Sequence, residues 1–477
     1  MKVVEFLKRE EGKTLEFKRD LSSPKNLMKT LVAFANTAGG RVIIGVEDKT
    51  RLPVGVECPL DEEERLCSLI ADSIRPRLIP NVEMITIEDK TLLVVEVFLS
   101  GSRPHWLKAE GPESSAYVRL GSTNRQADRE LIAELRRSVE GVAFDELPMT
   151  GLTVDDLDSS ALKTLFLDRL DIGENELLTL RLLKNEQGRL VPTKGAVLLI
   201  GKERERYFPD AWVQCGRFIG WDKADIFDHI ELHDHLPQAV DSIMLFLKKH
   251  AMRGADFSEI RRKDVWSIPL GILREAVINA LVHTDYSQRG APIRIAFFDD
   301  RIEIENPGIL LPGMTIDDMR QGVSKIRNHV IARVFRELNL IEQWGSGIPR
   351  IIREAKELGL PELQIMEIGM RLRFTVTMAE QITVQKATEQ VTEQVTEQVR
   401  RTLDCLKNEP LGARDAMQSI GLRHRPTFLY DYLQPAMDAG LVEMTQPESP
   451  KSPTQKYRLT AKGKYALVEN DQLEPGK

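Results

Sequence analysis

Apolar and polar positions in the N-terminal part of the chain follow first a helical and then a strand-like period. Apolar residues recur with helical spacing from Asn26 to Thr37, ahead of a turn at 38–40 and the apolar strand RVIIGVE. A second helical pattern covers 61–74. The next stretch, VEMITIEDKTLLVVEVFLS, places two apolar runs on either side of a polar turn, which predicts a hairpin. YVRLGSTNRQAD then predicts a strand that runs into a polar turn, so we expect an α/β domain over residues 1–135.

The middle of the chain carries patterns for two further α/β segments. In residues 136–262, DSSALKTLFLDRL predicts helix, GAVLLIGK and AWVQCGRFIG predict strands, and LPQAVDSIMLFLKKHA predicts a long amphipathic helix. Residues 263–380 follow with a helix, a hairpin, a helix, a glycine turn, a further helix and the strand MRLRFTVTM. We expect the first segment to connect domains and the second to form a compact α/β domain.

Three consecutive copies of Thr-Glu-Gln-Val occupy residues 388–399. In a helix, a valine at every fourth position would form a drifting apolar stripe suited to a partner helix, and so to a homo-oligomer. We favour a solvated linker over residues 381–400, because the repeat is short and otherwise polar.

Residues 401–470 contain three helical patterns followed by two strands around a loop rich in Pro, Ser and Lys. This order predicts a winged helix. Basic side chains stand ahead of its third helix and on its wing, where they could reach DNA bases and phosphates. The expected nucleic-acid contacts are Arg423, Arg425, Lys451 and Lys456. A winged helix that binds another protein is the alternative.

Length, charge and cysteine content narrow the class of protein. A chain of 477 residues exceeds what one hydrophobic core usually supports, so several domains of α/β and α+β type are expected. Its net charge of −7 gives no global attraction to phosphate, so nucleic-acid binding requires local basic patches. The four cysteines are scattered, which fits a reducing compartment, and no long apolar stretch predicts a membrane span. We therefore expect a cytoplasmic protein.

The main chemical signal lies in LREAVINALVHTDYS. Glu275 and Asn279 stand at i and i+4 and share one helical face, where a carboxylate can orient water and an amide oxygen can bind Mg²⁺ that bridges phosphates. Downstream, Asn306 and Gly308 end a hairpin strand, and Gly345 and Gly347 open a helix whose free N–H groups could face phosphate. The simpler interpretation is that Glu275 and Asn279 only solvate a helix.

The order of these motifs resembles the GHKL ATPase fold. The resemblance implies ATP and Mg²⁺ as cofactors, Glu275 as general base, Asn279 as Mg²⁺ ligand, and Gly345 and Gly347 as phosphate-loop glycines. The sequence departs from the GHKL pattern at Asn306, where the family carries an aspartate that contacts adenine. An asparagine can still pair with an adenine edge, through a different set of donors and acceptors.

EGKTLEFKRDL, LMKTLVAFANTAGGRVIIGVEDKTRLPVGV and YVRLGSTNRQAD together resemble the Schlafen-type Alba-like domain, which implies nucleic-acid binding. With the GHKL-like segment and the winged helix, the whole chain resembles the RecG-helicase-related transcriptional regulators. A helicase motor is not expected, since Gly12-Lys13-Thr14 lacks the earlier glycine and the strand of a P-loop. We expect a regulator that binds nucleic acid under the control of ATP.

Some Schlafen relatives cleave RNA with three carboxylates and a metal ion, which makes a phage-defence endoribonuclease the alternative function. Glu11, Glu16 and Asp48 stand where such carboxylates would bind Mg²⁺ or Mn²⁺ and activate water. The basic residues expected to contact DNA or RNA phosphates in this domain are Lys18, Arg119 and Arg125. The simpler interpretation is that these are surface charges at strand ends.

Four histidines complete the candidates. His229, His233 and His235 could hold a metal, but exposed surface histidines on an acidic helix are the favoured interpretation. His283 lies one helical turn beyond Asn279, either at the nucleotide or partly buried.

Overall fold

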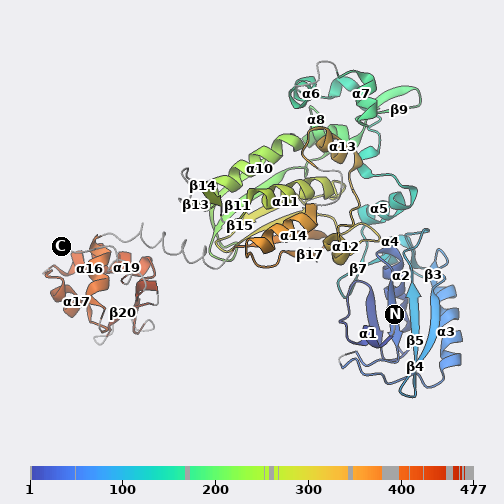
Figure 1. Cartoon of the computed structure of the whole chain (residues 1–477), viewed down its shortest axis with the longest axis horizontal. Coiled ribbons are helices and arrows are strands. Elements are labelled where there is room, and N and C mark those ends of the chain that lie inside the picture. Colours follow the sequence, from blue (N-terminus) through green and yellow to red (C-terminus); the bar gives the residue numbers. More distant parts are fainter. Residues whose placement is uncertain are drawn as a thin grey trace. The chain divides into compact units, whose positions relative to one another are not determined.

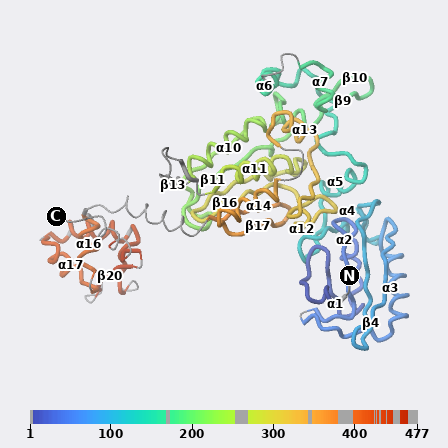
Figure 2. Tube along the Cα trace, viewed as in Figure 1, coloured from blue at the N-terminus to red at the C-terminus, as the bar shows by residue number. Residues whose placement is uncertain are grey.

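The computed structural model describes the chain in two units, Met1–Met378 and Ala379–Lys477. Figures 1 and 2 trace them in sequence colours. The described residues are 3–48, 50–166, 172–251, 253–256, 263–266, 268–341, 347–378, 397–407, 409–422, 424–446, 455–460, 462–464 and 467. Most of the Thr-Glu-Gln-Val repeat therefore lies outside the described residues.

The N-terminal part of the first unit is built on a four-stranded sheet. Its strands are β1 (Leu15–Lys18), β2 (Gly40–Ile44), β4 (Asn81–Ile87) and β5 (Lys90–Val97), in the order β1-β2-β5-β4. Only β1 and β2 pair in parallel, as expected for strands joined by a crossover helix. That helix, α2, spans Pro24–Asn36, and nine of its residues from Leu27 to Asn36 are buried.

Further elements surround this sheet. They are α1 (Val3–Leu7), α3 (Pro59–Ser73), β3 (Ile74–Arg75), β6 (Trp106–Leu107), α4 (Pro112–Ser115), β7 (Tyr117–Leu120), β8 (Thr123–Gln126) and α5 (Arg129–Glu140). The helices and the hairpin expected from the sequence are confirmed. YVRLGSTNRQAD differs from the expectation, because β7 and β8 form an antiparallel hairpin rather than one strand and a turn.

The second part of this unit contains a six-stranded sheet in the order β12-β11-β15-β16-β18-β17. Its strands are β11 (Val213–Ile219), β12 (Asp225–Leu232), β15 (Ile293–Phe297), β16 (Arg301–Pro307), β17 (Gln364–Ile368) and β18 (Arg371–Thr377). β11 and β15 are parallel, and the other neighbours are antiparallel. Strands from the expected connecting region thus complete the sheet of the expected nucleotide-binding segment.

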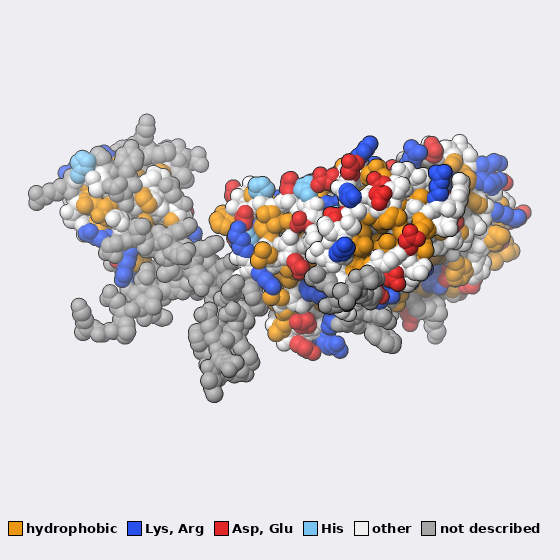
Figure 3. All heavy atoms as spheres, turned by 90° about the horizontal axis from the view of Figure 1, so that it is seen from above, with side chains coloured by type: hydrophobic (Ala, Val, Ile, Leu, Met, Phe, Trp, Pro, Cys, Tyr) orange, Lys and Arg blue, Asp and Glu red, His pale blue; other side chains and the backbone are white. Residues whose placement is uncertain are grey.

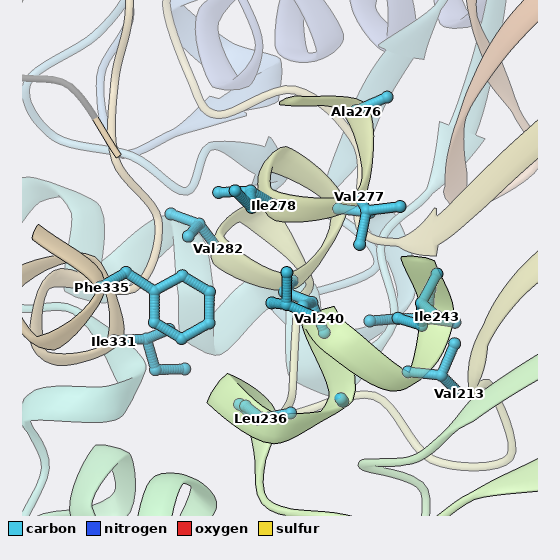
Figure 4. Packing of buried hydrophobic residues seen from close by; sticks show 14 of the residues in the cluster. Val213, Leu236, Val240, Ile243, Ala276, Val277, Ile278, Val282, Ile331 and Phe335 are labelled. Carbon is cyan, nitrogen blue, oxygen red and sulfur yellow. The ribbon is translucent and has the colours of Figure 1, made fainter. Parts of the chain in front are cut away.

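Helices lie against this sheet. Those nearest to it are α10 (Leu236–His250), α11 (Leu270–His283) and α14 (Gly347–Glu357) (Figure 1). The buried side of α11 contributes Val277, Ile278 and Val282 to one large hydrophobic core. Figure 4 shows these three side chains among residues of α10 and the side chains of Ile331 and Phe335. One face of α11 is therefore fixed by packing, which also fixes where the opposite face points.

The remaining elements of this unit are short. They are η1 (Phe144–Glu146), η2 (Val154–Asp156), α6 (Ser159–Leu165), α7 (Glu174–Thr179), β9 (Leu183–Glu186), β10 (Arg189–Pro192), α8 (Lys194–Ile200), α9 (Arg204–Tyr207), β13 (Arg253–Asp256), β14 (Lys263–Trp266), α12 (Ile316–Arg320) and α13 (His329–Glu337).

Two elements differ from their predictions. GAVLLIGK was expected as a strand, but residues 195–200 form a fully buried part of helix α8. The Thr193 side chain caps that helix by accepting a hydrogen bond from the Ala196 N–H at 3.2 Å. A short apolar run has no polar face, so its period cannot separate a buried helix from a strand. The histidine-rich stretch was expected on a helix, whereas it runs through strand β12.

The start of α13 is held by residues of η1. The Asp145 carboxylate accepts backbone hydrogen bonds from His329, Val330 and Ile331. Beside it, His329 Nδ1 lies 3.2 Å from Glu146 Oε2. Burial alone would raise the pKa of Glu146, but the hydrogen bonds from His329 and Ala143 outweigh it and lower the pKa to about 2. The same hydrogen bond raises the pKa of His329.

These shifts predict a pH-dependent contribution of His329 to stability. Glu146 contributes fully above its unfolded pKa. His329 contributes fully below its own unfolded pKa of about 6.5 and loses this contribution as the pH rises through its higher folded pKa, so the pair contributes most near pH 5–6. We expect His329→Gln to lower the melting temperature by about 2–4 °C near pH 5.5 and hardly at all near pH 8.5. The effect stays near 1 kcal/mol because the imidazole is 40% exposed. His229→Gln, on the exposed side of β12, is the control, and an equal loss at both pH values would contradict the linkage.

The second unit consists of short helices followed by a hairpin. Its elements are α16 (Glu397–Cys405), α17 (Ala413–Ser419), α18 (Arg425–Thr427), η3 (Phe428–Leu433), α19 (Gln434–Asp438), β19 (Val442–Met444) and β20 (Tyr457–Leu459). Leu411 and Tyr457 add a backbone bridge to the hairpin. The expected order of helices and strands is present in the described residues.

Two sequence expectations concern the surface and the cysteines. Lys and Arg side chains are interspersed with Asp and Glu over the face drawn in Figure 3, so a basic patch there is local rather than continuous. All four cysteines are free, and burial raises the pKa of Cys215 to about 12. Within the described residues, none of the helices combines the length and hydropathy of a bilayer span.

Candidate functional site

The polar face of α11 lines a cavity of about 420 Å³. Glu275, Asn279 and His283 succeed one another at four-residue intervals, so they share one face of the helix. The amide of Asn279 donates to Glu275 Oε1 at 3.2 Å. The predicted pair therefore lies on one side of the helix and faces an open cavity of a size common for small ligands.

Gly347, at the start of α14, makes the closest approach to this pair. A Cβ atom at Gly347 would lie 2.6 Å from Glu275 Cδ and closer still to Oε1. Arg350, one turn further along α14, donates to Glu275 Oε2 at 2.9 Å. A side chain at the glycine that the sequence predicted for the phosphate loop would thus displace the Glu275 carboxylate. Gly345 lies outside the described residues.

The end of β16 forms another wall of the cavity. Asn306 is 5% exposed, and its amide donates to the Pro307 carbonyl at 3.2 Å. Gly308 follows with φ +104°, a conformation that favours glycine, and a Cβ there would lie 2.8 Å from Arg327 Nη1. Both predicted residues therefore line the cavity together with Glu275, Asn279 and Gly347.

Cations that the sequence motifs did not identify line the same cavity. They are Lys325, Arg327, Arg336 and Arg350. Arg327 Nη1 lies 2.7 Å from Glu134 Oε1, whereas buried Arg336 Nε has no hydrogen-bond acceptor within the part of the chain that the structure describes. A buried donor without an acceptor is costly, so Arg336 favours an anionic ligand. No spacing rule marks these arginines in the sequence, because the fold alone brings them to the cavity.

His283 lies at the inner end of the polar face. Burial, followed by the charge of Arg327, lowers its pKa to about 4. His283 is therefore neutral near pH 7 and could offer a ligand one donor and one acceptor rather than a positive charge.

The three N-terminal carboxylates do not form the expected metal site. Glu11 Oε1 accepts the Phe17 N–H at 2.8 Å, the two oxygens of Glu16 are bound by Lys18 and Arg119, and Asp48 is exposed. Among the residues that the structure describes, no group of three or more His, Cys, Asp or Glu side chains is placed to hold a metal ion. The expectation of a three-carboxylate centre is therefore wrong for this structure.

The three basic residues expected to contact phosphate in the N-terminal part differ in how far they are buried. Arg119 is 1% exposed and donates to Gly12 O at 3.1 Å and Asn124 Oδ1 at 3.0 Å as well as to Glu16. It is a buried structural residue, so the prediction that it contacts phosphate is wrong. Lys18 is partly buried against Glu16, whereas Arg125 is exposed.

The C-terminal candidates are only partly described. Arg425, in α18, and Lys456, just before β20, are exposed. Arg423 and Lys451 lie outside the described residues. His229 and His233 are exposed on and just beyond β12, whereas His235 is half-buried, with Nε2 3.8 Å from Asp158.

Comparisons with known proteins give three family matches on separate segments. "Schlafen, AlbA_2" matches residues 11–128, and "Putative ATP-dependent DNA helicase recG C-terminal" matches residues 290–378. The second segment includes Asn306, Gly308 and Gly347 but begins after the helix that carries Glu275 and Asn279. Residues 397–460 match "Filamentation induced by cAMP protein Fic-like, C-terminal domain", where the sequence pattern had suggested a winged helix.

Solved structures give weaker likenesses. The DIP2311 protein from Corynebacterium diphtheriae is 18% identical, with a TM-score of 0.43, over 96% of this chain and 94% of that chain. The N-terminal domain of a RecG-related protein from Nitrosomonas europaea is 31% identical over 26% of this chain and 90% of its own, with a TM-score of 0.22. A Fic family protein from Desulfovibrio desulfuricans G20 is 18% identical over 70% of this chain and 77% of that chain, with a TM-score of 0.14.

The comparison with curated proteins gives no match. The family models agree with the sequence interpretation for the first two segments. Residues 11–128 are therefore similar to the Schlafen AlbA_2 domain model, and residues 290–378 are similar to the RecG-related HATPase_c_4 model.

Proposed function

We propose that this chain is a nucleic-acid-binding regulatory protein in which ATP, held with Mg²⁺ in the cavity beside α11, controls the engagement of nucleic acid. The observation that carries the proposal is that Glu275, Asn279, Gly308 and Gly347, predicted separately, line one cavity. The HATPase_c_4 match over residues 290–378 supports the same nucleotide.

The residues present fit a magnesium-bound triphosphate. Asn279 offers the amide oxygen for Mg²⁺, since its nitrogen is the atom that donates to Glu275. Arg336 would donate its unsatisfied Nε–H to a phosphate oxygen, and Arg327 would do so in competition with Glu134. Mg²⁺ would neutralise part of the phosphate charge when bound. Asn306, at the end of β16, would pair with the adenine edge.

The surroundings of Glu275 favour binding over rapid turnover. A general base needs a carboxylate oxygen free to accept a proton from water. Here Asn279 binds one oxygen and Arg350 binds the other. Hydrolysis would therefore require Arg350 to leave the carboxylate, and slow or ligand-gated turnover is the expected behaviour.

The proposed control of nucleic-acid binding is supported by the segment 308–327, which contacts both the cavity and the N-terminal part of the unit. The segment 308–327 contributes residues 308–311, 314, 319 and 322–327 to the cavity, and it also contacts the N-terminal part of the same unit. The Gly313 N–H donates to the Thr37 carbonyl at 2.6 Å. Lys13 Nζ lies 2.7 Å from Glu367 Oε1, which also accepts the Leu310 N–H at 2.8 Å. A ligand that moves this segment would therefore change contacts made by α2 and by the start of the AlbA_2 domain.

Replacing Asn279 with alanine tests the nucleotide site. The Asn279→Ala variant loses the proposed Mg²⁺ ligand, so we expect the affinity for a non-hydrolysable ATP analogue with Mg²⁺ to fall at least about tenfold, or 1.4 kcal/mol. Calorimetric titration of the full chain measures this. Asn175→Ala, on exposed helix α7, is the control. Equal affinity in Asn279→Ala and the wild type would rule out this geometry.

The regulatory part needs a separate measurement. Binding of the full chain to single-stranded and double-stranded DNA and to RNA is compared with and without the analogue, at one fixed salt concentration. We expect a ligand-dependent affinity in the wild type that is lost in Asn279→Ala. An affinity that the analogue leaves unchanged in the wild type would contradict coupling while leaving the nucleotide site intact.

A further inference from the structure

A second cavity, of about 430 Å³, lies on the other side of residues 282–285 and shares no lining residue with the first. Its walls come from α5, η1, α8, α9 and the loop 284–291. None of the motifs of the proposed nucleotide site belongs to it, so the proposed nucleotide does not explain the side chains that line it.

Two cations in this cavity share one aromatic ring. Lys194 Nζ lies 4.0 Å from the centre of the Phe144 ring, and Arg137 Cζ lies 5.4 Å from it. Among the described residues, neither cation has a carboxylate within ion-pair distance. Burial, followed by the charge of Arg137, lowers the pKa of Lys194. Two like charges held together in this way are stabilised by an anion between them.

The other charges of the cavity leave an excess of cations. Arg129 and Arg289 also line it, and so do the acids Glu130, Asp210 and Asp285. Asp285 already accepts hydrogen bonds from the Ser287 N–H at 3.0 Å and from Gln288 at 3.3 Å. Four cations therefore face three carboxylates, and one of these, Asp285, also lies 3.8 Å from Arg327, which does not line this cavity. This balance favours an anionic ligand.

An aromatic wall accompanies the cations. Tyr207 is partly exposed in the cavity, and Phe208 meets Phe144 edge to face with 6.2 Å between ring centres. Planar bases stack on such rings, while guanidinium and ammonium groups bind phosphate. We propose that this second cavity binds a nucleoside monophosphate unit, with its phosphate between Arg137 and Lys194 and its base against Tyr207. The unit is either a free nucleotide or the phosphorylated end of a nucleic-acid strand.

Titration of the full chain with AMP tests the proposal. We expect Lys194→Met and Arg137→Met each to weaken AMP binding at least tenfold, or about 1.4 kcal/mol, because each removes one of two phosphate donors. Without ligand, Lys194→Met should melt at the wild-type temperature or above, since it removes a desolvated charge beside another. Lys184→Gln, on the exposed hairpin strand β9, should bind AMP normally. Unchanged AMP affinity in both Lys194→Met and Arg137→Met would overturn the proposal.

Further binding measurements distinguish the second cavity from the first, and a free nucleotide from the end of a nucleic-acid strand. AMP binding should survive Gly347→Ala, and binding of the ATP analogue should survive Lys194→Met, so failure of one site is distinguishable from failure of the other. Adenosine should not bind, because it lacks the phosphate. If a short DNA strand with a terminal phosphate binds and is displaced by AMP, the natural ligand is the end of a nucleic-acid strand. If AMP binds but the strand does not, the natural ligand is a free nucleotide. AMP binding lost in Gly347→Ala but kept in Lys194→Met, or adenosine binding equal to that of AMP, would refute the second site.

Discussion

We expect Gly347→Ala to weaken binding of the ATP analogue roughly tenfold to a hundredfold, or about 1.4–2.8 kcal/mol. The new methyl group would occupy the position of the Glu275 carboxylate, with Cβ 2.6 Å from Cδ. Glu275 would have to turn away, which breaks its hydrogen bonds with Asn279 and Arg350 and narrows the cavity. Calorimetric titration measures the affinity, and circular dichroism checks that the variant is folded.

Gly271→Ala is the matched control for this experiment. Gly271 lies in α11, and a Cβ there would lie 3.7 Å from both carboxylate oxygens of Glu354, an ordinary contact distance. Alanine in place of glycine within a helix should stabilise the fold by up to about 1 kcal/mol and leave nucleotide affinity unchanged. If Gly271→Ala and Gly347→Ala bind the analogue equally well, Gly347 does not approach the ligand as the cavity suggests.

The second large effect is expected at Arg327. Its guanidinium lies 2.7 Å from Glu134 Oε1 and 3.8 Å from Asp285 Oδ2, and it also donates to the Ile309 carbonyl. The Glu134 and Asp285 side chains are 10% and 3% exposed. Arg327→Met would leave two buried acids without their cation, so we expect a loss of about 3–5 kcal/mol in the free energy of unfolding, measured by urea denaturation.

Two variants give this prediction a sharp control. Arg320→Met breaks the ion pair with Glu362, whose two side chains are 41% and 74% exposed, and should cost less than about 1 kcal/mol. Adding Glu134→Gln to Arg327→Met removes one of the orphaned acids and should recover part of the stability. Burial, followed by the Arg327 charge that opposes it, already raises the pKa of Glu134 to about 7. A double variant no more stable than Arg327→Met would show that Glu134 is not the orphaned group.

Arg327 also connects the two halves of the first unit. Glu134 belongs to α5, which follows the segment matched to AlbA_2, whereas Arg327 lines the cavity beside α11. A phosphate that binds Arg327 would compete with Glu134 for the same guanidinium. This competition is a physical route by which ATP could alter the AlbA_2 domain, and it adds to the contacts of Gly313 and Lys13.

The sequence by itself determined the local features of this protein. The spacing of Glu275 and Asn279 placed them on one helical face, glycine at 308 indicated a close backbone approach, and glycine at 347 indicated the start of a helix, since these properties depend on the chemistry of a few neighbouring residues. Apolar periods likewise predicted α2, α10 and the β4–β5 hairpin. The match to the HATPase_c_4 model includes Gly308 and Gly347 but not Glu275 and Asn279, and the AlbA_2 match covers the N-terminal motifs.

Only the tertiary structure decided which side chains meet across long stretches of chain. Arg119 pairs with Glu16, 103 positions earlier, and so it is buried instead of facing phosphate. GAVLLIGK became a buried helix, and β11 and β12 extended the central sheet, because packing against distant elements outweighed local preference. Arg327, Arg336, Arg137 and Lys194 entered cavities for the same reason: burial and charge pairing depend on spatial neighbours, which spacing along the chain does not encode.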